Sequence, residues 1–271
     1  MDPEPSRFNY LKTLKRMADS ETLSVVFQYY FDISFTESKL LTEVSKRDFK
    51  KIARILRKNK KGIPLAYLLG KWSFLGANLK IDKNVLVPRF DTEILASEAV
   101  RLINENNYKT ALDLCTGSGA IAIYIDKSSG ASLSASDISK KALKIARENA
   151  DKNQCDITFY ESDLLGDIDE KFDIIVSNPP YIKTKEIGRF DKTILREPKI
   201  ALDGGGDGLN FYRRIIGAAR EHLNGGGSLI FEIGEGQEED IETLLADAGF
   251  GEITSVNDLN GTVRVIFGKL I

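Results

Sequence analysis

From Thr92 onward, segments with helical periodicity alternate with short apolar segments, and this alternation restricts the chain to few folds. Strands that alternate with helices usually form a mostly parallel sheet covered by helices on both faces. The sequence therefore predicts an α/β domain. The expected strands are Thr110–Leu114, Ser132–Ser136, Ile157–Tyr160, Phe172–Ser177, Ser228–Glu232, Glu252–Val256 and Val263–Phe267. The expected helices are Thr92–Asn106, Ala120–Lys127, Lys140–Lys152, Phe211–Leu223 and Glu238–Ala248.

The residues before this region have a different pattern. Apolar residues recur there at helical spacing, as Leu11 and Leu14 do, and no strand is indicated before Trp72. Three short extended pieces follow and predict a small β-hairpin. The pieces are Trp72–Leu75, Asn78–Asp82 and Val85–Pro88. We expect a helical, substrate-recognising domain over residues 1–71, a hairpin linker over 72–90 and the α/β domain over 91–271.

Composition limits what such a chain binds. Its 271 residues are 42% hydrophobic and 29% charged, which suits a globular protein with a substantial core. A formal net charge of -2 argues against broad, stable nucleic-acid binding. Two cysteines outside any CxxC pair and one histidine do not make a usual zinc site, so no metal is expected. Neither a signal peptide nor a membrane span is indicated, and we expect a cytoplasmic protein.

Residues with chemical potential follow several expected strands, where ligands bind in open α/β sheets. The first strand leads into Asp113–Ala120, in which Gly117 and Gly119 permit a tight turn beside a helix N-terminus. The second leads to Asp137, 18 positions after Gly119, a spacing that suits a carboxylate binding both ribose hydroxyls. The third leads to Ser162–Leu164, which can flank an adenine. Together these residues predict a nucleoside site.

Each feature also has a plainer interpretation. A glycine turn between a strand and a helix can be only a turn, and Asp137 can simply cap the helix that starts near Ser139. The segment Gly117–Ala122 also fits the dinucleotide fingerprint, with alanine as the third small residue. A nicotinamide enzyme is therefore an alternative on these features alone. The glycine-rich stretch Gly204–Gly208 is expected to be a mobile loop by its composition.

The fourth strand is followed by the tetrapeptide Asn178–Tyr181, an Asn-Pro-Pro-Tyr sequence. Two prolines fix their own φ angles, and Pro180 favours an extended conformation at Pro179. The side-chain oxygen of Asn178 and the carbonyl of Pro179 then become two acceptors in fixed geometry, which suit the two donors of a planar NH2 group. Tyr181 offers a flat face for stacking on that group. The alternative is a proline-rich turn that only starts a loop.

These residue types suit transfer of a methyl group to nitrogen. An amide nitrogen is a poor nucleophile, but the sulfonium methyl of S-adenosylmethionine is already activated, so alignment is the main requirement. Two oxygen acceptors stabilise the positive charge that grows on the nitrogen. The sequence thus predicts a methyltransferase acting on an amide or amine nitrogen, with Asn178, Pro179 and Tyr181 as catalytic residues. His222 is expected to lie on a helix away from the strand ends and to take no part.

The motifs resemble those of known enzymes. Asp113–Ala120, Asp137 and Asn178–Tyr181 resemble the Rossmann-like methyltransferases that act on exocyclic or amide nitrogens. Four flanking segments are similar to the HemK family, and the resemblance covers roughly residues 60–268. The segments are Ile63–Gly70, Val85–Arg89 with Thr92 and Glu93, Leu202–Leu209, and Glu232–Gln237.

The resemblance implies a fold, a reaction and a partner. HemK members methylate the side-chain amide of the glutamine in the Gly-Gly-Gln motif of peptide chain release factors. Their helical N-terminal domain and hairpin precede a Rossmann-like, seven-stranded, mostly parallel methyltransferase domain. The implied cofactor is S-adenosylmethionine, and its implied contacts are Cys115, Thr116, Gly117, Ser118, Gly119, Asp137, Leu164 and Asn178. The implied glutamine pocket consists of Asn178, Pro179, Pro180 and Tyr181.

This sequence departs from the family pattern at two places. Cys115 stands where the family usually has glycine, so the loop there must tolerate a Cβ atom. Phe90 and Asp91 replace the usual Pro-Glu after Arg89, which affects the substrate side of the site.

Two other functions compete with glutamine methylation. An adenine-N6 DNA or RNA methyltransferase also needs acceptors for an amino group, although it would be expected to carry a recognition domain or a basic groove. A non-catalytic protein that binds a translation factor would not need the complete Asn178–Tyr181 set. Both considerations favour the release-factor enzyme.

Overall fold

The computed structural model describes residues 7–33, 35–41 and 43–271. The first six residues, part of the segment in which no signal peptide is expected, lie outside this description. Contacts divide the chain into two compact units, Met1–Trp72 with Asp191–Arg196, and Ser73–Phe190 with Glu197–Ile271. The assignment of Asp191–Arg196 to the first unit has no signal in the sequence. The domain bounds at residues 71 and 90 stay a prediction.

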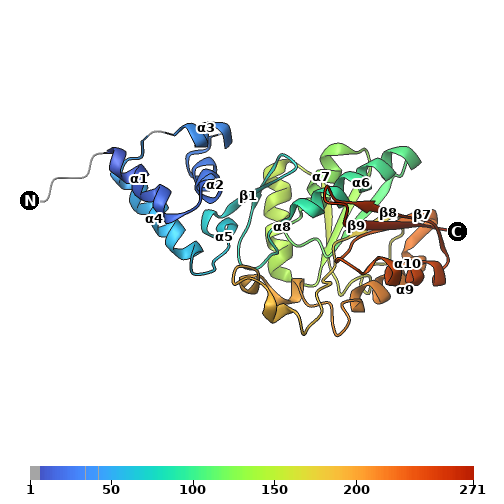
Figure 1. The fold of residues 1–271 in the computed structure, drawn as a ribbon. Helices are drawn as coiled ribbons and strands as arrows, with labels where there is room; N and C mark the ends of the chain where they lie inside the picture. Colours follow the sequence, from blue (N-terminus) through green and yellow to red (C-terminus); the bar gives the residue numbers. More distant parts are fainter. Residues whose placement is uncertain (1–6, 34, 42) are drawn as a thin grey trace, which may run out of the picture. The chain divides into compact units, whose positions relative to one another are not determined.

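The N-terminal unit is helical (Figure 1). Its helices are α1 (Arg7–Met17), α2 (Ser20–Phe31), α3 (Phe35–Leu40), α4 (Lys46–Asn59) and α5 (Leu65–Leu69). Asp19 and Ser45 cap α2 and α4, because their side chains accept hydrogen bonds from the backbone N–H groups three residues later. Apolar side chains at helical spacing, among them Leu14, Val26 and Ile52, form one buried cluster that holds these helices together.

A two-stranded hairpin, β1 (Lys71–Phe74) with β2 (Ala77–Lys80), leads into the second unit. The third extended piece predicted from the sequence, Val85–Pro88, is not a strand. The backbone N–H of Val87 donates to the buried carboxylate of Glu197 at 3.0 Å instead of to a neighbouring strand. A side chain therefore replaces the strand partner that the apolar pattern of Val85–Pro88 suggested.

The second unit contains a seven-stranded sheet in the order β5-β4-β3-β6-β7-β9-β8. Its strands are β3 (Thr110–Leu114), β4 (Ser132–Asp137), β5 (Ile157–Glu161), β6 (Phe172–Ser177), β7 (Leu223–Glu232), β8 (Phe250–Asn257) and β9 (Val263–Leu270). The first five are parallel neighbours, and β9 pairs antiparallel with both β7 and β8. The seven expected strands and the mostly parallel sheet are confirmed.

Helices cover both faces of this sheet (Figure 1). They are α6 (Phe90–Asn106), α7 (Ala120–Ser128), α8 (Lys140–Asn153), α9 (Asn210–His222) and α10 (Glu238–Asp247). On the face of α9 and α10, alternate residues of the central strands, such as Leu112 and Leu114 of β3, join Tyr212 in one buried cluster. The opposite alternation directs Asp113 away from that cluster, and its side chain is also fully buried.

The chain order of the strands creates a switch point between β3 and β6. From β3 the sheet grows outward through β4 to β5, and the chain then returns to the other side of β3 with β6. Loops that leave the carboxyl ends of β3 and β6 therefore diverge and open a crevice, the usual ligand position in such sheets.

The glycine-rich stretch Gly204–Gly208, expected to be mobile from its composition, is closely packed at both of its ends. Gly204 and Gly208 are buried against the residues that follow β6. A Cβ atom at Gly204 would lie 2.7 Å from the Cα of Tyr181, and one at Gly208 would lie 2.5 Å from the Tyr181 carbonyl oxygen. Glycine is needed because two backbones approach closely, which composition alone does not distinguish from flexibility.

This packing predicts unequal effects of alanine within one loop. Gly208→Ala adds a Cβ against backbone atoms at a φ of +84°, so we expect it to lower the free energy of unfolding by about 2 kcal/mol or more. Gly206→Ala is the matched control, because a Cβ there meets nothing within 4 Å. Urea unfolding of both variants measures the difference. Equal stabilities would contradict the close packing described here.

Candidate functional site

A cavity of about 260 Å³ opens at the carboxyl ends of β3, β4, β5 and β6. All four strand ends predicted to meet do line it: Cys115 and Gly117 after β3, Asp137 at the end of β4, Ser162–Leu164 after β5, and Asn178 after β6. The other lining residues are Asn84, Val85, Leu86, Leu114, Ser136, Ile138, Ser139, Ala142, Pro180, Pro198, Ile200, Ala201, Phe211 and Arg214. Mostly apolar walls with few polar groups are typical of small-molecule sites.

Asp113 fixes the loop after β3 through two hydrogen bonds. One carboxylate oxygen, Oδ2, accepts from Thr116 Oγ1 at 2.6 Å and from the backbone N–H of Ala122 at 3.1 Å. These bonds join the turn after β3 to the first turn of α7. The other oxygen, Oδ1, is buried without a partner in the described residues. Burial raises the pKa of Asp113 to about 7.

Three residues of this loop adopt positive φ angles. Cys115, Gly117 and Gly119 have φ values of 65°, 55° and 81°. Glycine accepts such angles freely, whereas a Cβ atom makes them unfavourable. This geometry explains why a glycine suits position 115 and shows that the cysteine is accommodated in a left-handed conformation. Leu164, another lining residue, has a φ of 57°.

Asp137 closes the loop from the neighbouring strand. Its Oδ2 accepts from the backbone N–H of Gly117 at 2.9 Å, and its Oδ1 accepts from the N–H of Ser139 at 2.8 Å. The cap of α8 is the Ser139 side chain, which accepts from the N–H of Ala142. Asp137 is therefore not the helix cap considered above. Asp137 is half-buried, and desolvation raises its pKa despite these two bonds.

The predicted cofactor residues divide into two groups. The first group lines the cavity and consists of Cys115, Gly117, Asp137, Leu164 and Asn178. The second group does not line the cavity and makes structural contacts instead; it consists of Thr116, Ser118 and Gly119. Thr116 donates to Asp113, the Ser118 carbonyl accepts from Asn149 at 2.9 Å, and Gly119 lies against α8, where its Cβ would be 3.3 Å from Ala146.

The corner after β6 likewise presents only part of its predicted set. Asn178 and Pro180 line the cavity, whereas Pro179 and Tyr181 do not, and Tyr181 packs against the sheet core. The amide nitrogen of Asn178, Nδ2, donates to Thr92 Oγ1 at 3.2 Å. Its oxygen is thereby left to accept from another group. Stacking of the Tyr181 ring on a substrate stays a prediction.

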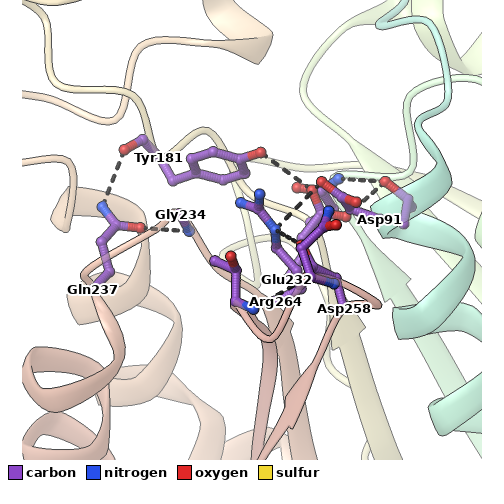
Figure 2. A network of polar contacts seen from close by, with 11 residues as sticks. Asp91, Tyr181, Glu232, Gly234, Gln237, Asp258 and Arg264 are labelled. Carbon is purple, nitrogen blue, oxygen red and sulfur yellow. Dashed lines mark hydrogen bonds and ion pairs between the residues drawn. The ribbon is translucent and has the colours of Figure 1, made fainter.

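Sequence reasoning assigned no role to three residues that hold this corner (Figure 2). Glu232, at the end of β7, accepts from Thr92 Oγ1 at 2.6 Å and from the Tyr181 hydroxyl at 3.2 Å. Gln237, at the start of α10, donates to the Tyr181 carbonyl at 3.1 Å. Glu232 could have been found by examining the end of the fifth strand as well as the first four. All three residues lie in the segments that carry the family resemblance, although no role was derived for them from the sequence.

Arg264 on β9 places a positive charge beside this network (Figure 2). Its Nε lies 3.4 Å from Asp91 and 3.1 Å from Asp258. Asp91, one of the two departures from the family pattern, thus forms an ion pair, while the neighbouring Phe90 side chain is 81% exposed. Burial raises the pKa of Glu232 to about 7, and burial with the nearby carboxylate raises that of Tyr181, so its phenol stays a donor.

Within the described ranges, no cluster of His, Cys, Asp or Glu is arranged to hold a metal ion. In the same part of the chain, no helix combines the length and apolar character that crossing a membrane requires.

Comparisons with known proteins add sequence and fold relationships. Residues 91–209 match the family described as Methyltransferase small domain. The chain is 40% identical over 233 residues to a release factor glutamine methyltransferase of Fusobacterium nucleatum, across 84% of this chain and 66%, just under two thirds, of that protein. It is 40% identical over 240 residues to the release factor glutamine methyltransferase of Lactococcus lactis, across 88% of this chain and 84% of that protein.

A solved structure described as ribosomal protein L11 methylase, from Lactobacillus delbrueckii, is also similar. It has a TM-score of 0.50 and 28% sequence identity, and the match covers 68% of this chain and 81% of that chain. The α/β methyltransferase fold predicted from the sequence is confirmed.

The left-handed conformation of Cys115 predicts an unusual response to glycine. We expect Cys115→Gly to be more stable than Cys115→Ala by about 1 kcal/mol, because glycine removes the Cβ strain while both variants lose the thiol. Cys155 is the matched control, since its φ is not positive and glycine there should be the less stable variant. Chemical denaturation of the four variants measures the differences. If Cys115→Gly is less stable than Cys115→Ala, as expected for the two Cys155 variants, the assignment of backbone strain to Cys115 is contradicted.

The raised pKa of Glu232 predicts a pH-dependent stability. Between its usual value of 4.5 and about 7, the folded chain keeps a proton that the unfolded chain releases, so this group stabilises less as pH rises. Between pH 4.5 and 8, the stability of the wild type relative to Glu232→Gln should fall by at least about 1.4 kcal/mol, the equivalent of one pKa unit. Urea unfolding across that range measures it. If the difference in unfolding free energy between the wild type and Glu232→Gln does not change with pH, the raised pKa of Glu232 is contradicted.

Proposed function

We propose, since the chain belongs to the release factor glutamine methyltransferase family, that it methylates the glutamine of the Gly-Gly-Gln motif in peptide chain release factors. The methyl group would move from S-adenosylmethionine to the side-chain amide nitrogen. The observation that supports this proposal most is Asn178, whose amide lies on the cavity wall with its nitrogen engaged by Thr92.

The cavity suits a nucleoside cofactor. Its apolar walls include Leu86, Ile138 and Ile200, which can contact an adenine. Each oxygen of the Asp137 carboxylate has two lone pairs, and one backbone N–H is bonded to each, so both can still accept from a ribose hydroxyl. S-adenosylmethionine supplies a methyl carbon that is activated by its bond to a sulfonium.

The task of the protein is then to hold the acceptor nitrogen. Asn178 Oδ1 and the Pro179 carbonyl would each accept one hydrogen of the substrate NH2 group. These bonds would fix the nitrogen in place and stabilise the positive charge that grows on it during transfer. The backbone of the corner is held by Gln237 and by the close approach of Gly208, which limits its movement.

His222 is placed poorly for proton transfer. It is the last residue of α9 and immediately precedes β7, so it lies at the amino ends of the parallel strands. The cavity is at their carboxyl ends. We therefore assign no base role to His222. Methylation would make the nitrogen cationic and acidic, and we expect it to release one proton to water.

Release factors are the proposed partners, and stable binding to nucleic acid is not expected. Because these factors act in translation, we expect the enzyme to work in the cytoplasm.

The proposal predicts a labelled product. Incubation of the chain with methyl-labelled S-adenosylmethionine and purified release factor should label the glutamine of the Gly-Gly-Gln motif, as peptide mapping can show. Asn178→Ala should lower kcat by about 100-fold or more, because it removes one acceptor of the substrate amide. Asn260→Ala, in an exposed turn, is the control and should retain the rate. Label in DNA or RNA, with none in release factor, would contradict the proposal.

A further inference from the structure

The amide of Asn178 has two ends of nearly the same shape and opposite hydrogen-bonding character. Its oxygen accepts and its nitrogen donates. A substrate NH2 group can bond only the oxygen end. Rotation of the amide by half a turn would fit the same space but would set two donors against each other. Something in the protein must therefore select one orientation.

The contacts behind Asn178 provide that selection. Glu232 ends β7, and its carboxylate is 1% exposed. The Thr92 hydroxyl donates its single hydrogen to Glu232 Oε2 at 2.6 Å. With that hydrogen used, Thr92 Oγ1 can only accept, and Asn178 Nδ2 donates to it at 3.2 Å. In this Glu232–Thr92–Asn178 triad, the ionised Glu232 carboxylate can only accept. Thr92 must therefore donate to Glu232, and Asn178 must donate to Thr92.

Glu232 is itself held as an acceptor. Its other oxygen, Oε1, accepts from the Tyr181 hydroxyl at 3.2 Å, so both oxygens face donors. The triad joins α6, the end of β7 and the corner after β6, and Thr92 is 5% exposed. Water therefore has little access to Thr92 and Glu232, where it could otherwise satisfy a reversed bond.

We propose that Glu232 is a positioning residue that acts through Thr92 to turn the Asn178 amide oxygen toward the substrate nitrogen. The inference rests on the proposed methylation of an amide nitrogen. It adds that the orientation of Asn178 depends on a carboxylate that touches neither substrate nor cofactor.

Leucine at position 232 is the most direct perturbation, because it fills a similar volume and removes both acceptor oxygens. The Thr92 hydroxyl is then free to donate to the Asn178 oxygen, and the amide can reverse. Glutamine is a weaker perturbation, because its oxygen can stay on Thr92 while its NH2 group donates to the Tyr181 hydroxyl. Thr92→Val removes the hydroxyl and also leaves Nδ2 without its partner, whereas Thr92→Ser keeps it.

The test measures kcat, KM and cofactor affinity on the acceptor that the wild type labels, at pH 8, where Glu232 is ionised. We expect Glu232→Leu and Thr92→Val each to lower kcat by about 10-fold or more, with KM for that acceptor and the affinity for S-adenosylhomocysteine changed less than threefold. Thr92→Ser should retain most of the rate. The double variant of Glu232→Leu and Thr92→Val should be no slower than either single one, because both remove the same effect. Glu235→Leu, at an exposed residue of the following loop, is the matched control.

The outcomes separate this inference from the proposed function. If the wild type leaves release factor unlabelled, the substrate assignment fails, and the triad is then judged by the same rate ratios on the acceptor found. If Glu232→Leu retains kcat within twofold, or if the two single losses multiply in the double variant, Glu232 does not act through Thr92. Circular dichroism checks folding of each variant, and the Thr92→Val and Thr92→Ser pair decides the matter should Glu232→Leu not fold.

Discussion

The hydrogen bond from Asn178 Nδ2 to Thr92 Oγ1, 3.2 Å long, determines which end of the Asn178 amide faces the cavity. The remainder of the site can be understood as support for that group. The parallel strands bring the corner after β6 beside the loop after β3. Gln237 and Gly208 hold its backbone, and Glu232 supplies the acceptor that orders the side chains behind it.

This arrangement has energetic costs that the sheet offsets. Cys115 and Leu164 hold left-handed conformations, and Asp113 and Glu232 are buried carboxylates whose pKa values are raised to about 7. Such features are unfavourable in isolation and persist only where surrounding structure fixes them. Here they lie at the ends of buried strands, where the local backbone is already determined by its neighbours. The costs thus fall on residues beside the cavity.

Periodicity was sufficient to predict the strands, because buried parallel strands are short apolar runs bounded by polar residues. It also predicted that Asp137 and Asn178 meet at one cavity, since carboxyl ends of parallel strands share an edge. Periodicity failed at Val85–Pro88, where the Glu197 carboxylate replaces a strand partner. Composition did not reveal the close packing of Gly204 and Gly208, because glycine serves both close packing and flexibility. Contacts between distant residues, such as Thr92 with Glu232, leave no local pattern.

In the proposed reaction, Asn178 accepts a hydrogen bond from the nitrogen that is methylated. A crystal structure of the chain with S-adenosylhomocysteine and a glutamine-containing peptide from a release factor measures this contact. We expect the glutamine amide nitrogen to lie within about 3.2 Å of both Asn178 Oδ1 and the Pro179 carbonyl oxygen. A peptide amide bound outside the cavity, or an Asn178 Nδ2 that faces the peptide while Oδ1 contacts Thr92, would contradict it.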